Sequence, residues 1–293
     1  MMKQGKNINL FLMDGDASGR IKCTLANWTG IAYKIPRTML DKAREITYLD
    51  QTGVYFLFGT SDESGDPVVY IGQAGIRKNG RGILCRIDEH RRNSKMYYWT
   101  EAVAFTTSNN SFGPTEISYL ENRFCNMAMG AKRYAVKNGN DPSPGNITEE
   151  KESELEEFVS YAKLVMGAFG YKVFEPLVAT RSTVIEINPI DNEPTLYFST
   201  KRAEATGKRT PEGFVALAGS KISLSTTKSC PDNVIKYREK YAGKWDDQGY
   251  LTADLLFTSP SAAAGFIGGS SLNGNIMWKD EFGRTLKDIE DTE

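Results

Sequence analysis

The sequence has few of the residues from which zinc sites and disulfide frameworks are built. Its 293 residues include one histidine and four cysteines. The cysteines are Cys23, Cys85, Cys125 and Cys230, which are widely separated and form no CxxC pair. This spacing argues against a zinc site or a disulfide scaffold and suits a reducing cytosol.

The chain also lacks an excess of either charge and a long apolar run. It carries 36 Lys and Arg residues against 37 Asp and Glu residues, a formal net charge of −1. A nucleic-acid-binding surface would therefore have to come from a local patch instead of bulk charge. The apolar run after Lys6 is too short for a signal peptide or a membrane helix. We therefore expect a cytoplasmic protein without a membrane partner.

A hairpin pattern lies between residues 53 and 72. The runs 53–59 and 68–72 are rich in aromatic and β-branched residues, and a segment rich in Ser, Asp and Gly separates them. This composition predicts two antiparallel strands joined by a loop. Tyr55 and Tyr70, one from each strand, can then lie close together on one face of the sheet. Tyrosine is also common in buried strands, so a purely structural pair explains the same pattern.

A basic segment follows the hairpin. Between residues 71 and 100 only Asp88 and Glu89 are acidic, and Tyr97–Trp99 add aromatic rings. The basic residues are Arg77, Lys78, Arg81, Arg86, Arg91, Arg92 and Lys95. Such charges release counterions from phosphates and such rings stack on bases, so the segment is a candidate DNA-binding surface. A solvated helix face followed by a core strand explains the same composition.

Helical patterns are expected at 116–129, with Thr115 as the cap, and at 149–169. Glu121 borders the apolar stripe of the first helix, where a carboxylate is either a border residue or a ligand at the edge of a site. Glu116 is the second candidate ligand. Short strands are expected at 170–177, 183–187 and 195–199.

A second small domain is expected towards the C-terminus. Its predicted elements are a helix at 232–241, a strand at 250–257, a helix from Pro260 capped by Ser259, and a closing hairpin at 275–286. It contains no evident catalytic set, so target recognition and structural support both remain open.

The N-terminal segment offers an alternative site. Residues 7–13 and 20–26 are expected as strands around a turn, and a helical pattern runs from Pro36 to Leu49. Asp14 and Asp16 follow the first strand and could present two carboxylates to Mg²⁺, as in haloacid-dehalogenase-like phosphatases. Asp and Gly in a hairpin turn need no such role.

Residues 50–140 together resemble the GIY-YIG nuclease module. The residues that carry the resemblance are Gly53-Val54-Tyr55, Tyr70-Ile71-Gly72, Arg86 and His90 at i and i+4, Glu121 and Asn138. The run Ser259–Ala264, with Asn273-Gly274 and Trp278-Lys279, resembles an uncharacterised α/β domain often attached to such modules. The resemblance implies an α+β fold, in which a small antiparallel or mixed sheet is flanked by helices and followed by a second small α/β domain.

The same resemblance implies a division of the chain. Residues 1–50 would be an N-terminal β-hairpin and helix extension, 51–140 the nuclease domain, 141–205 a helix and connector, and 206–293 the C-terminal domain, a candidate for target recognition.

The activity implied by the resemblance is hydrolysis of DNA phosphodiester bonds with one divalent cation, Mg²⁺ or Mn²⁺. Glu121 would hold the metal by oxygen, and Arg86 would bind the scissile phosphate. Tyr55 or Tyr70 would activate water if a cation lowered its pKa, and His90 would share the proton relay.

The remaining matched residues would shape this site. Gly53 and Gly72 would allow close backbone approach, and Asn138 would tie the site together by hydrogen bonds. Gln73 stands where a lysine is common in the family, which removes one phosphate contact.

Three functions therefore remain open on the sequence. They are a metal-dependent DNA endonuclease, a nucleic-acid-binding module that keeps the fold without cutting, and a phosphatase built on Asp14 and Asp16. The sequence leaves the preferred DNA form, the oligomeric state and the pathway open.

Overall fold

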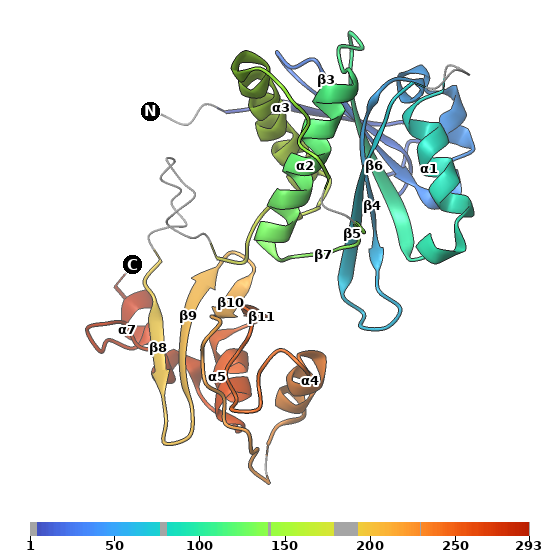
Figure 1. Ribbon diagram of the computed structural model, residues 1–293. Coiled ribbons are helices and arrows are strands. Elements are labelled where there is room, and N and C mark those ends of the chain that lie inside the picture. Colours follow the sequence, from blue (N-terminus) through green and yellow to red (C-terminus); the bar gives the residue numbers. More distant parts are fainter. Residues whose placement is uncertain (1–4, 77–80, 140–141, 179–192, 229, 293) are drawn as a thin grey trace. The chain divides into compact units, whose positions relative to one another are not determined.

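A computed structural model describes residues 5–76, 81–139, 142–178, 193–228 and 230–292 (Figure 1). Contacts divide the chain into two units, Met1–Pro176 and Leu177–Glu293, and each is described by itself. Both units combine helices with a sheet, which confirms the predicted α+β class. None of the helices described is long and apolar enough to cross a membrane.

Unit 1 is built on a seven-stranded mixed sheet, counted over its described residues. Its strands are β1 Ile8–Leu12, β2 Ile21–Leu25, β3 Gly30–Pro36, β4 Gly53–Thr60, β5 Pro67–Ala74, β6 Trp99–Thr107 and β7 Ala135–Val136. The order is β1-β2-β3-β6-β4-β5-β7, and only the β5–β7 pair is parallel. The predicted hairpins form as β1–β2 and β4–β5. Because β3 pairs with β6, the N-terminal strands extend the same sheet.

Helices cover both faces of this sheet (Figure 1). They are α1 Ile83–Arg92 on one face, and α2 Pro114–Ala131 and α3 Glu149–Ala168 on the other. The alternation of side chains along β4 explains the two layers. Val54, Phe56 and Phe58 join the core under α2 and α3, whereas Tyr55 and Leu57 face α1.

Three local predictions in unit 1 are wrong. The helix expected at 36–49 is three 3₁₀ turns, at Arg37–Met39, Lys42–Glu45 and Thr47–Asp50, because Ile46 adopts an extended backbone between the last two. Thr115 does not cap α2. Pro114 is its first residue, and the Glu116 carboxylate accepts a hydrogen bond from the Gly113 N–H (3.0 Å).

The third wrong prediction in unit 1 concerns the residues after α3. The strand expected at 170–177 is a turn, because Gly170 takes a left-handed backbone (φ +89°) and directs the Tyr171 N–H back to the Met166 carbonyl at the helix end. The strand expected at 183–187 lies outside the described residues.

Unit 2 contains a four-stranded antiparallel sheet in its described residues, ordered β11-β10-β9-β8. Its elements are β8 Leu196–Ser199, β9 Glu204–Thr210, β10 Gly213–Ala216, α4 Asp232–Lys240, β11 Leu255–Phe257, α5 Pro260–Gly268, α6 Gly274–Met277 and α7 Leu286–Glu290. The core centres on Trp278, whose ring packs on Phe198 and Phe214 and whose Nε1 donates to the Pro260 carbonyl (3.0 Å).

Predictions for unit 2 are confirmed in part. Ser259 caps α5, where its Oγ accepts from the Ala262 N–H, and α4 forms as expected. The closing hairpin is confirmed in part. Lys279 and Thr285 form an antiparallel bridge, and the Leu286 N–H donates to the Trp278 carbonyl (2.9 Å), but Asn273 and Thr285 cap the short helices α6 and α7 on either side of it. The strand expected at 250–257 is limited to β11.

Candidate active site

The candidate site lies where β5 becomes the edge of the sheet. Strand β7 pairs only with Val68 and Val69, so in the described structure no strand covers the following residues on that side. Asn138 takes the place of a strand there. Its side-chain amide donates to the Ile71 carbonyl (2.6 Å), and its side-chain oxygen accepts from the Ile71 N–H (3.1 Å). This two-point contact holds the β5 backbone between Tyr70 and Gly72.

Three rings meet on the α1 face of this edge. The Tyr55 hydroxyl lies 2.7 Å from His90 Nε2. The ring centroid of Tyr70 lies 6.3 Å from that of Tyr55 and 4.9 Å from that of His90. Tyr55 and His90 are buried, whereas Tyr70 is partly exposed. The structure therefore brings the two tyrosines and the histidine together.

Gly72 makes room for this cluster. It is the cross-strand partner of Tyr55 in the β4–β5 register. A Cβ at Gly72 would lie 2.4 Å from the Tyr55 hydroxyl oxygen and 2.9 Å from Tyr70 Cε1, closer than such atoms approach. Gly53 is equally confined, because a Cβ there would lie 2.1 Å from the Phe105 carbonyl oxygen. Both glycines allow close approach, as predicted, and Gly72 admits the phenol itself.

Arg86 lies one helical turn before His90, and its side chain is about two-fifths exposed (42%). Its Nη1 donates to Glu89 (2.9 Å), and its positive charge opposes the rise in the pKa of Tyr55. The contact with Glu89 helps to raise the pKa of Arg86. A permanent positive charge therefore stands at the open side of the phenols.

Burial controls the protonation of the three rings. It raises the pKa of Tyr55 well above its ordinary value, although Arg86 acts in the opposite direction. Burial, followed by the charge of Glu121, raises the pKa of Tyr70. Burial also lowers the pKa of His90 to about 4, with a further contribution from Arg86. At neutral pH both phenols are thus protonated and His90 is a neutral acceptor, so Arg86 alone does not activate a tyrosine.

Glu121 approaches the same edge from α2. Gln73 Nε2 donates to Glu121 Oε2 (2.8 Å) and to Ser118 Oγ (3.3 Å). Burial raises the pKa of Glu121, opposed by the Gln73 hydrogen bond and by Arg86. The resemblance predicts no role for Gln73 beyond the loss of a phosphate contact. The alternation of β5, which points Gln73 away from Tyr70 and towards α2, is the signal that could have identified it as the partner of Glu121.

The donor set at Glu121 suits a hard cation. Among the described residues no group of three or more His, Cys, Asp and Glu side chains could hold a metal ion. One carboxylate, completed by water and phosphate oxygens, matches the way Mg²⁺ binds in phosphate-processing sites. Glu116 is committed elsewhere, since its carboxylate holds the Gly113 N–H at the start of α2.

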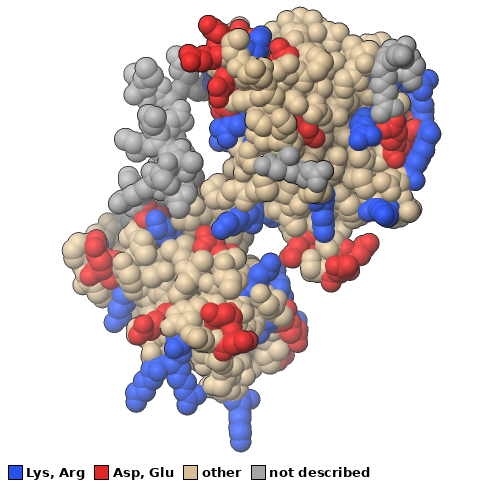
Figure 2. All heavy atoms as spheres, viewed as in Figure 1, with Lys and Arg blue, Asp and Glu red and all other residues tan. Residues whose placement is uncertain are grey.

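The predicted DNA-binding residues are only partly accounted for. Arg77 and Lys78 lie outside the described residues. Arg91 and Arg92 both contact Asp88 (2.5 Å each), and Arg91 also contacts Asp41 (2.9 Å). Figure 2 shows basic and acidic side chains intermingled on this part of unit 1.

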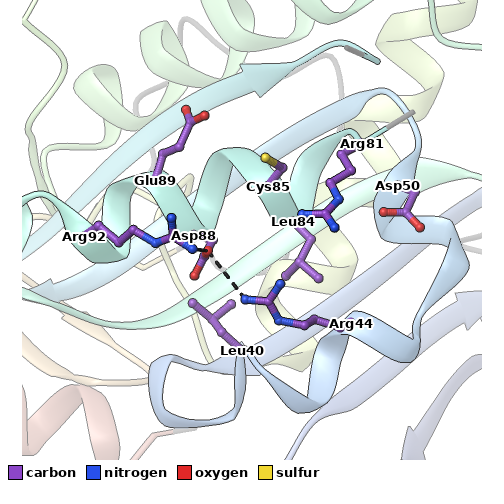
Figure 3. A pocket seen from close by; sticks show the side chains of 9 residues that line it. All are labelled: Leu40, Arg44, Asp50, Arg81, Leu84, Cys85, Asp88, Glu89 and Arg92. Carbon is purple, nitrogen blue, oxygen red and sulfur yellow. Dashed lines mark hydrogen bonds and ion pairs between the residues drawn. The ribbon is translucent and has the colours of Figure 1, made fainter. Parts of the chain in front are cut away.

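A pocket of about 280 Å³ lies beside this ion-pair cluster (Figure 3). Arg44 and Arg92 both point to Asp88 there, and Arg81 is part of the lining. Lys95 is exposed beyond the end of α1. The basic segment therefore has much of its charge neutralised, and of its basic residues the structure places Arg86 beside the candidate site.

The turn at Asp14 and Asp16 is explained by its own hydrogen bonds. Arg20 donates to both oxygens of Asp14 (3.0 and 2.8 Å), and this contact holds the pKa of Asp14 well below its usual range. Asp16 accepts from the Ser18 N–H (2.8 Å). Both carboxylates thus stabilise the β1–β2 turn.

Replacing Gly72 by alanine should disrupt the ring cluster. The added Cβ collides with the Tyr55 hydroxyl, so we expect Gly72→Ala to lower the free energy of unfolding of unit 1 by about 1–3 kcal/mol, a typical cost of overpacking. Gly75→Ala is the matched control, because a Cβ there meets nothing within 4 Å; its effect should stay within about 0.5 kcal/mol. Urea denaturation of both variants measures this, and equal effects would contradict the packing described.

His90 should make stability depend on pH. Its native pKa of about 4 lies below the usual 6.5, so the unfolded state binds more protons between these values. Stability contributed by neutral His90 is therefore complete above about pH 6.5 and is lost as pH falls towards 4, with a slope of at most about 1.4 kcal/mol per pH unit.

Denaturation curves of wild type and His90→Gln across this range isolate the effect. The variant should lose less stability on acidification than the wild type. Equal losses of unfolding free energy in the two proteins on acidification would show that His90 is not held neutral.

Comparison with known protein families finds a match in unit 2. Residues 196–290 match the model of a family described as a domain of unknown function (DUF4357). This agrees with the expected uncharacterised C-terminal domain and assigns it no activity. No curated protein and no solved structure matches the chain. The matched residues include none of those that form the candidate site.

Proposed function

We propose that this protein is a metal-dependent DNA endonuclease of the kind that residues 50–140 resemble, the GIY-YIG nucleases. The observation that carries the proposal is convergence at one edge of the sheet. The residues concerned are Tyr55, Tyr70, Arg86, His90, Glu121 and Asn138, which come from separate elements of unit 1. A fold kept only for structure has no need of a buried phenol–imidazole pair beside an arginine and a half-buried carboxylate.

The positions of the rings suggest the direction in which protons move. Tyr55 is fully buried, whereas Tyr70 is partly exposed, and their ring centroids lie 6.3 Å apart. An attacking water would give its proton to the Tyr70 oxygen, Tyr70 would pass its own proton to Tyr55, and Tyr55 would pass its proton to His90 Nε2. In this relay the neutral imidazole of His90, the hydrogen-bond partner of Tyr55, would be the terminal proton acceptor.

Arg86 and Glu121 supply the charges that this relay needs. The exposed part of the Arg86 guanidinium would bind the scissile phosphate and offset charge that develops on it. Glu121, held by Gln73, would bind Mg²⁺ or Mn²⁺. When bound, such a cation polarises the phosphate and stabilises the leaving oxygen. Either positive charge near Tyr70 lowers the cost of removing its proton.

Removal of the Glu121 charge should abolish cleavage. With supercoiled DNA and Mg²⁺ or Mn²⁺, we expect Glu121→Gln and Arg86→Ala each to reduce the cleavage rate by about 100-fold or more, because each removes several kcal/mol of transition-state stabilisation. Glu116→Gln is the matched control on the same helix, since glutamine can still accept the hydrogen bond at the start of α2. It should cleave at close to the wild-type rate.

Chelation of the metal should stop the wild-type reaction. Cleavage that survives EDTA, or that Glu121→Gln leaves unchanged, would contradict the proposal. Binding of DNA that weakens with salt, without any cutting, would favour the non-cleaving module instead.

A further inference from the structure

The two nitrogens of the His90 ring have different partners. Nε2 lies 2.7 Å from the Tyr55 hydroxyl, and Nδ1 is in direct contact with the Met96 sulfur. The side chain is buried, with 7% of the residue exposed. Its ring therefore has a defined neighbour at each end, one from the sheet and one from the turn after α1.

The chemistry of the sulfur decides which nitrogen carries the proton. A thioether has lone pairs and no hydrogen, so it can accept a hydrogen bond but cannot donate one. A neutral imidazole that donates to Met96 through Nδ1–H keeps Nε2 unprotonated. The opposite tautomer would place a bare nitrogen lone pair against the sulfur and an N–H against the Tyr55 oxygen.

We infer that Met96 fixes the tautomer of His90, so that Nε2 faces Tyr55 as a proton acceptor. The hydrogen bonds described link the Met96 side chain to His90 and not to either tyrosine or to any reacting atom. Met96 therefore acts through His90, as a positioning residue. The catalytic role of this tautomer rests on the proposed nuclease function. The tautomer itself does not depend on any activity of the protein.

The backbone around Met96 is held in place, although methionine is a flexible side chain. Met96 ends the short turn Ser94–Met96, in which the Asn93 side chain accepts a hydrogen bond from the Lys95 N–H (3.1 Å). The side chain of Arg37 also binds this turn. Its guanidinium donates to the carbonyls of Arg91 (2.9 Å) and Met96 (3.2 Å).

Aromatic rings hold this arginine in turn. The guanidinium carbon of Arg37 lies 4.6 Å from the ring centroids of both Tyr97 and Trp99. The carbonyl of Trp99 also accepts from Arg37 (3.2 Å). The end of α1 and the start of β6 are thus joined through one side chain, and the sulfur of Met96 is presented to the ring from an anchored backbone.

The charged and titratable groups around the His90 ring favour its neutral form at pH 7. They are Arg86 and Glu89 on its own helix, and Tyr55 and Tyr70 from the sheet. Both phenols are protonated at neutral pH and Arg86 is positive, so a second proton on the imidazole is disfavoured. The question at pH 7 is therefore only which nitrogen carries the single proton.

The experiment is a long-range ¹H–¹⁵N correlation spectrum of the full-length, tag-free protein labelled with ¹⁵N, at pH 7. His90 is the single histidine in the chain, so the spectrum contains one imidazole. We expect Nδ1 to resonate as a protonated nitrogen and Nε2 as an unprotonated one. In Met96→Leu, which conserves volume but removes the acceptor, the ratio of tautomers should move towards Nε2–H by about three- to tenfold, the effect of one weak hydrogen bond.

Met129→Leu is the matched control, because Met129 is exposed on α2. It should leave the imidazole spectrum unchanged. A wild-type ring protonated at Nε2, or a Met96→Leu spectrum identical to wild type, would overturn the inference. Absence of DNA cleavage with the Nδ1–H tautomer present would instead refute the proposed function and leave the role of Met96 intact.

Discussion

The hydrogen bond between Tyr55 and His90 is the interaction on which the arrangement of this site depends. It joins the central strand β4 to helix α1 across a buried interface. It needs a neighbour without a side chain, which Gly72 provides, and a polar partner for the far side of the imidazole, which is the sulfur of Met96. A buried polar group that loses its hydrogen-bond partner costs free energy, so the loss of any one of these contacts destabilises the others.

Burial and charge oppose each other at this edge of the sheet. Burial keeps the tyrosines protonated and the histidine neutral, and the single positive charge of Arg86 does not reverse this. In the proposed nuclease, a cation held by Glu121 would add positive charge next to Tyr70. Proton transfer would then depend on bound metal and phosphate.

Regular spacing made much of the site predictable from sequence. Alternation along two strands placed Tyr55 and Tyr70 on one face, and the four-residue interval placed Arg86 and His90 on one side of a helix. Met96 could not be predicted in this way, because its role comes from a contact with His90 on α1 that no local pattern encodes. Caps also limit the predicted closing hairpin, since Asn273 and Thr285 start short helices on either side of the antiparallel bridge between Lys279 and Thr285.

The most direct test of the central claim is the position of the metal. Crystals grown with Mn²⁺ and a short DNA would be measured at the manganese absorption edge. The account predicts an anomalous peak about 2.0–2.2 Å from a carboxylate oxygen of Glu121, with a phosphate contacting both the ion and Arg86. An ion bound elsewhere, with the Glu121 carboxylate still accepting its hydrogen bond from Gln73, would contradict it.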